Sequence, residues 1–175
     1  MGADRFRLHR PLRVLAAVAA AAVILGAGCL SADLSKDAKV NAGVLECLPP
    51  GTQAPTAVAR AVWFPNASGF ESADNTGRGY MTGVVALAGN RLWFMTWDET
   101  LKQYEMRHVV EVLPAIRVEV VRGGTASMLV VQSRNRSFDG YELMNGGQMG
   151  SDSEATRSLC DSIQALRLKS PEPDS

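Results

Sequence analysis

Histidine and cysteine, which serve in many catalytic and metal sites, are scarce in this chain: its 175 residues include two histidines and three cysteines. A hydrolase triad needs a histidine, and a zinc site needs several histidine or cysteine ligands close together. His9 lies in the basic N-terminal segment. His108 lies in a predicted strand without a nucleophile motif nearby, so we interpret it as a structural residue. The sequence therefore predicts a non-enzymatic protein with no catalytic residues, metal site or cofactor.

Long apolar runs and net charge are also missing. The run Val14–Gly28 has 15 uncharged, mostly apolar residues, fewer than the about 20 that span a bilayer, and this excludes a polytopic membrane protein. Lysine plus arginine and aspartate plus glutamate number 18 each. Four arginines against one aspartate give residues 1–28 a net charge of +3, which leaves −3 for the rest. A mildly acidic body has no electrostatic basis for binding nucleic acid.

What the N-terminus does contain is typical of an export signal: a basic segment followed by a short apolar run. The run ends Ile24-Leu25-Gly26-Ala27-Gly28-Cys29. This resembles the lipobox of bacterial lipoproteins, with Gly26 where leucine is commonest. The resemblance implies a signal peptide over 1–28 and lipidation of Cys29. The alternatives are ordinary cleavage with an incidental Cys29, or an uncleaved anchor helix.

The residues after Cys29 bear on location. Leu30 and Ser31 follow it, whereas an aspartate there tends to retain lipoproteins at the inner membrane. The resemblance thus implies a lipid-anchored protein of the cell envelope. It would face the periplasm from the outer membrane if the organism has one, and otherwise lie on the outer face of the cell membrane. Residues 29–56 are predicted to form the lipidated N-terminus and a tether, with one short helix over 33–47. A flexible chain of about 25 residues spans about 25–30 Å.

The two remaining cysteines, Cys47 and Cys160, belong to an exported protein in which disulfides persist. We predict a disulfide between them, which would clamp the N-terminal segment to the C-terminal helix. A metal pair or a reactive thiol is the alternative, and a single histidine beyond the signal argues against the metal.

From residue 57 the pattern turns to β structure, with short apolar runs separated by turn residues such as Gly89-Asn90 and Gly123-Gly124. This predicts seven antiparallel strands in a barrel or sandwich. The predicted strands cover 57–64, 80–87, 91–97, 104–112, 116–120, 128–132 and 138–144.

The C-terminal part is predicted to be a helix. Residues 151–154 form a capping-box pattern. Ala155, Leu159, Ile163 and Leu166 then fall on one face of a helix. Prolines at 171 and 173 end the predicted helix, so residues 171–175 are predicted to be a disordered tail.

Seven strands and one amphipathic helix, in this order, resemble the pleckstrin-homology-like fold. The stretch Gly83–Phe94 is similar to the second-to-third strand hairpin of GRAM and bacterial pleckstrin-homology-like domains, and Tyr104–Val112 to their fourth strand. The resemblance implies one domain over 57–170, a bent barrel whose open corner is plugged by the helix. Phosphoinositide-binding members gather basic residues in the loop after the first strand. Here that loop, 65–78, offers Glu71, Asp74 and Arg78, so we carry no phosphoinositide site over.

Both faces of the predicted third strand are apolar, because Trp93 and Trp97 alternate with Leu92 and Phe94. Either one face is covered by the N-terminal segment or the helix, or Trp63, Trp93 and Trp97 form an exposed patch for a partner or an acyl ligand.

Two functions follow from these alternatives. The first is an interaction module that binds another envelope component, expected to be a protein, beside the membrane that holds its anchor. The second is a carrier or sensor of a lipid or other apolar small molecule. A carrier predicts an enclosed cavity lined by residues such as Met81, Met95 and Met128.

Overall fold

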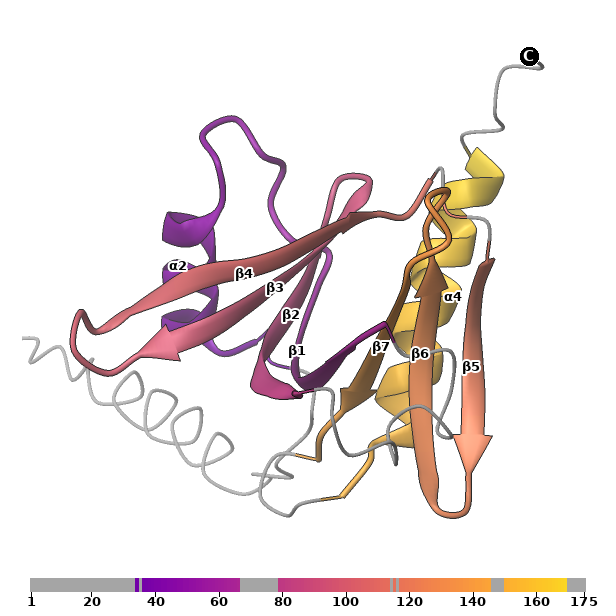
Figure 1. The fold of residues 1–175 in the computed structure, drawn as a ribbon. Helices are drawn as coiled ribbons and strands as arrows, with labels where there is room; N and C mark the ends of the chain where they lie inside the picture. Colours follow the sequence, from indigo (N-terminus) through magenta and orange to yellow (C-terminus); the bar gives the residue numbers. More distant parts are fainter. Residues whose placement is uncertain are drawn as a thin grey trace, which may run out of the picture.

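The computed structural model describes residues 34, 36–66, 79–113, 115, 117–145 and 150–169, which contain two helices and seven strands (Figure 1). The signal peptide with Cys29, nearly all of the polar stretch at 65–78 and the tail at 171–175 lie outside the described residues. The elements in chain order are α2 (Ala38–Cys47), β1 (Ala57–Pro65), β2 (Met81–Ala88), β3 (Arg91–Asp98), β4 (Gln103–Glu111), β5 (Arg117–Gly123), β6 (Ala126–Gln132), β7 (Phe138–Leu143) and α4 (Ser153–Lys169).

All seven strands join one antiparallel sheet in the order β4-β3-β2-β1-β7-β6-β5. Strand β1 connects its two halves, because it pairs with β2 over 57–63 and with β7 over 61–65. In Figure 1 the β1–β4 half is turned relative to the β5–β7 half, and α4 packs on the latter. The predicted fold class, a bent antiparallel seven-stranded structure capped by one C-terminal helix, is confirmed.

Glycines are required at two turns and at one close approach in this sheet. Gly89 and Gly124 have φ of 59° and 58° in the turns β2–β3 and β5–β6, a region that side chains with a Cβ rarely adopt. A Cβ on Gly83 would collide with the carbonyl oxygen of Met95. That collision site coincides with the register shift between β3 and β4 at Phe94/Met95. Gly83 therefore lets β2 lie against an irregular part of β3.

The main core lies between the sheet and α4. Leu159 and Ile163 of α4 are buried in it, with Ala155 and Leu166 at its edge. This confirms the predicted apolar face. Its largest fully buried sheet side chains include Phe94 and Tyr141.

Asp152 caps the start of α4. Its Oδ1 accepts a hydrogen bond from Ala155 N at 2.8 Å, as an N-cap side chain does. Ser151, which the capping-box pattern placed first, has another role: its Oγ accepts from Ser127 N at 2.8 Å. The helix thus begins one residue later than the pattern suggests and is attached to β6.

A second core lies on the other face of the β1–β4 half, under α2. Leu34, Val44 and Leu48 from the N-terminal segment pack there against the sheet, which contributes Val58, Val84, Ala86, Ala88, Trp93 and Met95. Leu34 N donates to Val58 O at 2.7 Å. From Leu34 onward, much of the segment predicted as a tether is therefore part of the folded domain.

The approach of α2 to the sheet is close at one glycine. A Cβ on Gly43 would come within 2.9 Å of the Tyr104 ring. Glycine in a helix interior costs about 1 kcal/mol relative to alanine. Here it gives the Tyr104 ring the space it occupies against α2.

The predicted Cys47–Cys160 disulfide is wrong, because both cysteines are free. Cys160 is buried in the main core, whereas Cys47 packs at the edge of the α2 cluster. On β2 these two clusters take alternate residues, Val85 and Leu87 against Val84 and Ala86, so they occupy opposite faces of the sheet. The sheet separates the two thiols.

Candidate binding groove

The three tryptophans do not form one patch. Trp63 is 8% exposed in the main core, and Trp93 is 3% exposed in the α2 cluster on the other face. Trp97 is 44% exposed. Helix α2 covers the second apolar face of β3 around Trp93, as the first alternative expected, and leaves Trp97 partly open.

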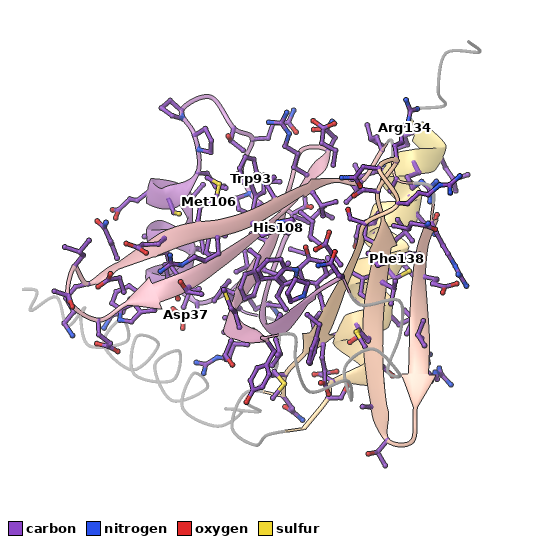
Figure 2. The ribbon with its side chains drawn as sticks, in the orientation of Figure 1. Asp37, Trp93, Met106, His108, Arg134 and Phe138 are labelled. Carbon is purple, nitrogen blue, oxygen red and sulfur yellow. The ribbon has the colours of Figure 1, made fainter. Side chains whose placement is uncertain are left out.

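His108, on β4, packs against Trp63 and lies close to Asp139. Its ring stacks on Trp63 with centroids 4.5 Å apart and an interplanar angle of 14°. Its Nε2 lies 3.1 Å from Asp139 Oδ1, without the geometry of a hydrogen bond. Figure 2 labels His108 on β4, and His108 lines a depression together with Ser133–Asn135 and Asp139 of the β6–β7 region. These contacts support its interpretation as a structural residue.

Trp97 lies at the rim of an open groove of about 660 Å³ between α2, the start of β2 and the end of the β3–β4 hairpin. We call this the aromatic groove. Its lining is mainly apolar and includes Leu34, Val40, Tyr80, Val84, Trp97 and Tyr104. Of these residues, only Trp97 was predictable from the sequence as a site residue, since the groove forms only where α2 docks on the sheet.

Two aromatic rings form one wall of the groove. Trp97 and Tyr104 meet edge to face, with centroids 5.1 Å apart and an interplanar angle of 72°, an arrangement that aromatic pairs favour. Burial raises the pKa of the Tyr104 hydroxyl; nearby Arg60 opposes this and Asp37 adds to it. The phenol therefore remains neutral around pH 7, and the wall carries no charge of its own.

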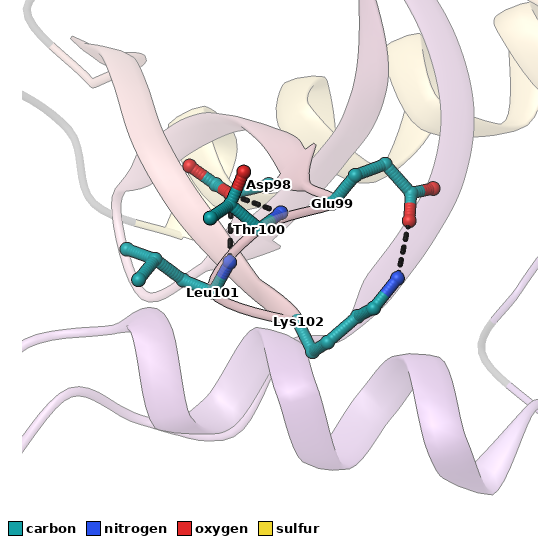
Figure 3. A network of polar contacts seen from close by, with 5 residues as sticks. All are labelled: Asp98, Glu99, Thr100, Leu101 and Lys102. Atoms are coloured by element: carbon teal, nitrogen blue, oxygen red, sulfur yellow. Dashed lines mark hydrogen bonds and ion pairs between the residues drawn. The ribbon is translucent and has the colours of Figure 1, made fainter.

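The turn after Trp97 is held by local polar contacts (Figure 3). Asp98 Oδ1 accepts from Thr100 N at 2.7 Å and from Leu101 N at 2.8 Å. These two hydrogen bonds lower the pKa of the Asp98 carboxyl. Lys102 Nζ lies 2.7 Å from Glu99 Oε2. The contacts fix the hairpin end that presents Trp97.

The chemistry of the groove suits binding to an apolar surface or segment. Among the described residues that line it, Arg60 and Glu99 are charged. Across the described ranges, no group of three or more histidine, cysteine, aspartate or glutamate side chains could hold a metal ion. Among the described helices, none is long and apolar enough to cross a membrane.

The methionines expected to line an enclosed cavity lie apart. Met95 is buried in the α2 cluster, Met128 is buried in a small cluster with Val130, and Met81 is 44% exposed.

A second open depression of about 600 Å³ lies beside Pro49–Gln53 and Arg91.

Comparisons with known proteins concern the fold alone. No family model matches the chain, and no curated protein matches it. Among solved structures, the chain is similar to the crystal structure of the pleckstrin homology domain of ArhGAP27. The two are 14% identical with a TM-score of 0.43, and the match covers 62% of this chain and 96% of that one.

Proposed function

We propose that this chain is a lipid-anchored protein of the cell envelope, and that its β domain is a non-enzymatic module that binds another envelope component in the aromatic groove. The anchor is proposed from the lipobox-like residues ending at Cys29. The observation that carries the binding proposal is the open, mainly apolar groove with Trp97 and Tyr80 at its rim.

The packing of the domain favours a module over a carrier. The main core is filled by side chains such as Phe94, Leu129 and Tyr141, all fully buried. A carrier would need its ligand enclosed, whereas the aromatic groove is open to the surface. Native mass spectrometry of the purified chain separates the two functions. A co-purifying apolar molecule of fixed mass would favour the carrier.

The anchor is tested by Cys29→Ser, with Cys47→Ser as the matched control. We expect Cys29→Ser to accumulate as an unprocessed precursor without lipid, because the modified thiol is required before cleavage of a lipoprotein. Cys47→Ser should be processed and membrane-bound like the parent. Normal cleavage of Cys29→Ser into a membrane-bound mature form would contradict the proposal.

A further inference from the structure

The described part of the chain begins in the wall of the aromatic groove. Leu34 lines the groove and is hydrogen-bonded through its N–H to Val58 O at 2.7 Å. Cys29 precedes it by five residues. Five residues reach at most about 18 Å even when fully extended. A lipid on Cys29 is therefore attached within about 18 Å of the groove.

Exposed apolar side chains lie at the rim of the groove and in the turn beside it. Tyr80 is 67% exposed and Trp97 44% exposed. Leu101, in the turn that follows Trp97, is 58% exposed. Tyrosine and tryptophan are enriched at membrane–water interfaces because each ring has an apolar body and a polar edge.

Carboxylates near the groove are engaged in local contacts. Asp37 accepts backbone N–H groups at the start of α2, and Asp98 accepts those of the β3–β4 turn. Glu99 pairs with Lys102. Arg60 adds a positive charge within the groove. With Arg60 and Lys102 set against the carboxylates of Asp37, Asp98 and Glu99, the net charge around the groove is small, which limits repulsion toward a bilayer that contains anionic lipids.

We infer that the occupant of the aromatic groove is the surface of the bilayer that holds the anchor, with Tyr80, Trp97 and Leu101 in its interfacial layer. The inference rests on the proposed function, because the lipid on Cys29 supplies the proximity. A short connection gives the rim a high effective concentration at the membrane. The domain then lies on the bilayer, whereas a flexible tether over residues 29–56 would have held it clear of the headgroups.

Trp97 is the natural reporter, because Trp63 and Trp93 are buried. The lipidated full chain is placed in vesicles of phosphatidylethanolamine and phosphatidylglycerol, in which part of the acyl chains carry bromine. Bromine quenches tryptophan emission only at short range, whereas iodide reaches tryptophan from water. We expect quenching by brominated lipid and protection from iodide, and we expect Trp97→Phe to lose the bromine-sensitive emission.

Two variants serve as controls. The first combines Trp97→Phe with Leu168→Trp, which moves the reporter to an 83% exposed position near the end of α4, away from the β3–β4 hairpin (Figure 1). Iodide should quench this variant and brominated lipid should not. The second inserts about 20 glycine and serine residues between Cys29 and Leu34, a flexible span of about 25 Å. Its Trp97 should be quenched less by bromine and more by iodide.

The anchor is measured in the same samples by flotation with the vesicles and by the mass of the lipid adduct. If the chain floats with its adduct but iodide alone quenches Trp97, the inference is overturned and the proposed anchor stands. If Trp97 is shielded from both quenchers, another molecule covers the groove, and the inference is again overturned. If the chain has no adduct and does not float, the proposed function fails and the inference fails with it.

Discussion

The indole of Trp63 and the imidazole of His108 are stacked 4.5 Å apart, and both rings reach the same oxygen, Asp139 Oδ1. The Trp63 Nε1–H donates to it at 3.0 Å, and His108 Nε2 lies 3.1 Å away. The three residues come from β1, β4 and β7. Because β4 and β7 are not neighbours in the sheet, the contact joins its two halves across the core.

Asp139→Ala should therefore destabilise the domain, since it leaves the buried Trp63 N–H without an acceptor. The expected loss is about 1–3 kcal/mol of unfolding free energy, measured by urea unfolding. Asp139→Asn is the matched control, because its amide oxygen can still accept from Trp63, and it should cost less than alanine. Equal losses in the two variants would show that the hydrogen bond is not what Asp139 contributes.

The C-terminal helix is predicted to be essential to the core. Replacing Leu159 and Ile163 together by alanine should unfold or nearly unfold the domain. Each such truncation costs about 2–5 kcal/mol, against a total stability of about 5–15 kcal/mol. Leu168→Ala, at an 83% exposed position of the same helix, should melt like the parent. A double variant that melted within a few degrees of the parent would contradict the place of α4 in the core.

The order of the helices and strands was predictable because the turn residues and the periodicity of apolar residues indicate the same elements over most of the chain. Gly89 and Gly124 lie in turns as expected, and Leu159 and Ile163 face the core. Pairing between distant segments was less predictable. Counting cysteines, together with the expectation of export, predicted a disulfide, but α2 and α4 pack on opposite faces of the sheet, so Cys47 and Cys160 remain apart.

The candidate site was predictable only in part, for the same reason. Trp97 lies at the groove rim as one alternative expected, but neither the periodicity of apolar residues nor composition shows that Trp63 and Trp93 face opposite sides of the sheet. That difference depends on strand register. Leu34 and Tyr104 join the groove through the docking of α2, and Leu34 is a single apolar residue in a stretch of small and polar ones.

The docking of α2 depends on Gly43. Gly43→Leu should push the helix away from the Tyr104 ring, which a Cβ would already approach within 2.9 Å. We expect faster hydrogen exchange across residues 38–47 while the main core stays protected. Ala42→Leu, at an exposed position of the same helix, is the matched control and should exchange like the parent. Unchanged exchange in Gly43→Leu would mean that Tyr104 yields without disturbing α2.

The cysteines should be reduced and slow to react. Burial raises the pKa of both thiols, and nearby carboxylates add to the effect at Cys47 and Cys160. Less thiolate is then present at neutral pH than in a free cysteine, so alkylation by iodoacetamide should be slow in the folded chain and fast in urea. Peptide mapping without reductant should find Cys47 and Cys160 as separate thiols. A linked pair would contradict the structure.

Tyr141 and the two thiols set the alkaline limit of the domain's stability. Burial raises the pKa of the Tyr141 hydroxyl well above its usual value, as it does for the two thiols. The folded state therefore holds these protons more tightly than the unfolded state. Their contribution is complete at neutral pH and is lost as pH rises through the alkaline range. Urea unfolding at increasing pH should show this fall, and Tyr141→Phe should reduce it. A flat profile would contradict the burial of these groups.

Hydrogen exchange of the lipidated chain on vesicles tests the central proposal most directly, because it maps the occupied surface without a chosen reporter. The parent is compared with the variant whose connection after Cys29 is lengthened by about 20 flexible residues. We predict that the parent is more protected at 79–82 and 97–104, the groove rim, and that both chains exchange alike along β5 and α4. Equal exchange at the rim in the two chains, or extra protection of the parent elsewhere, would contradict a module held with its aromatic groove on the membrane.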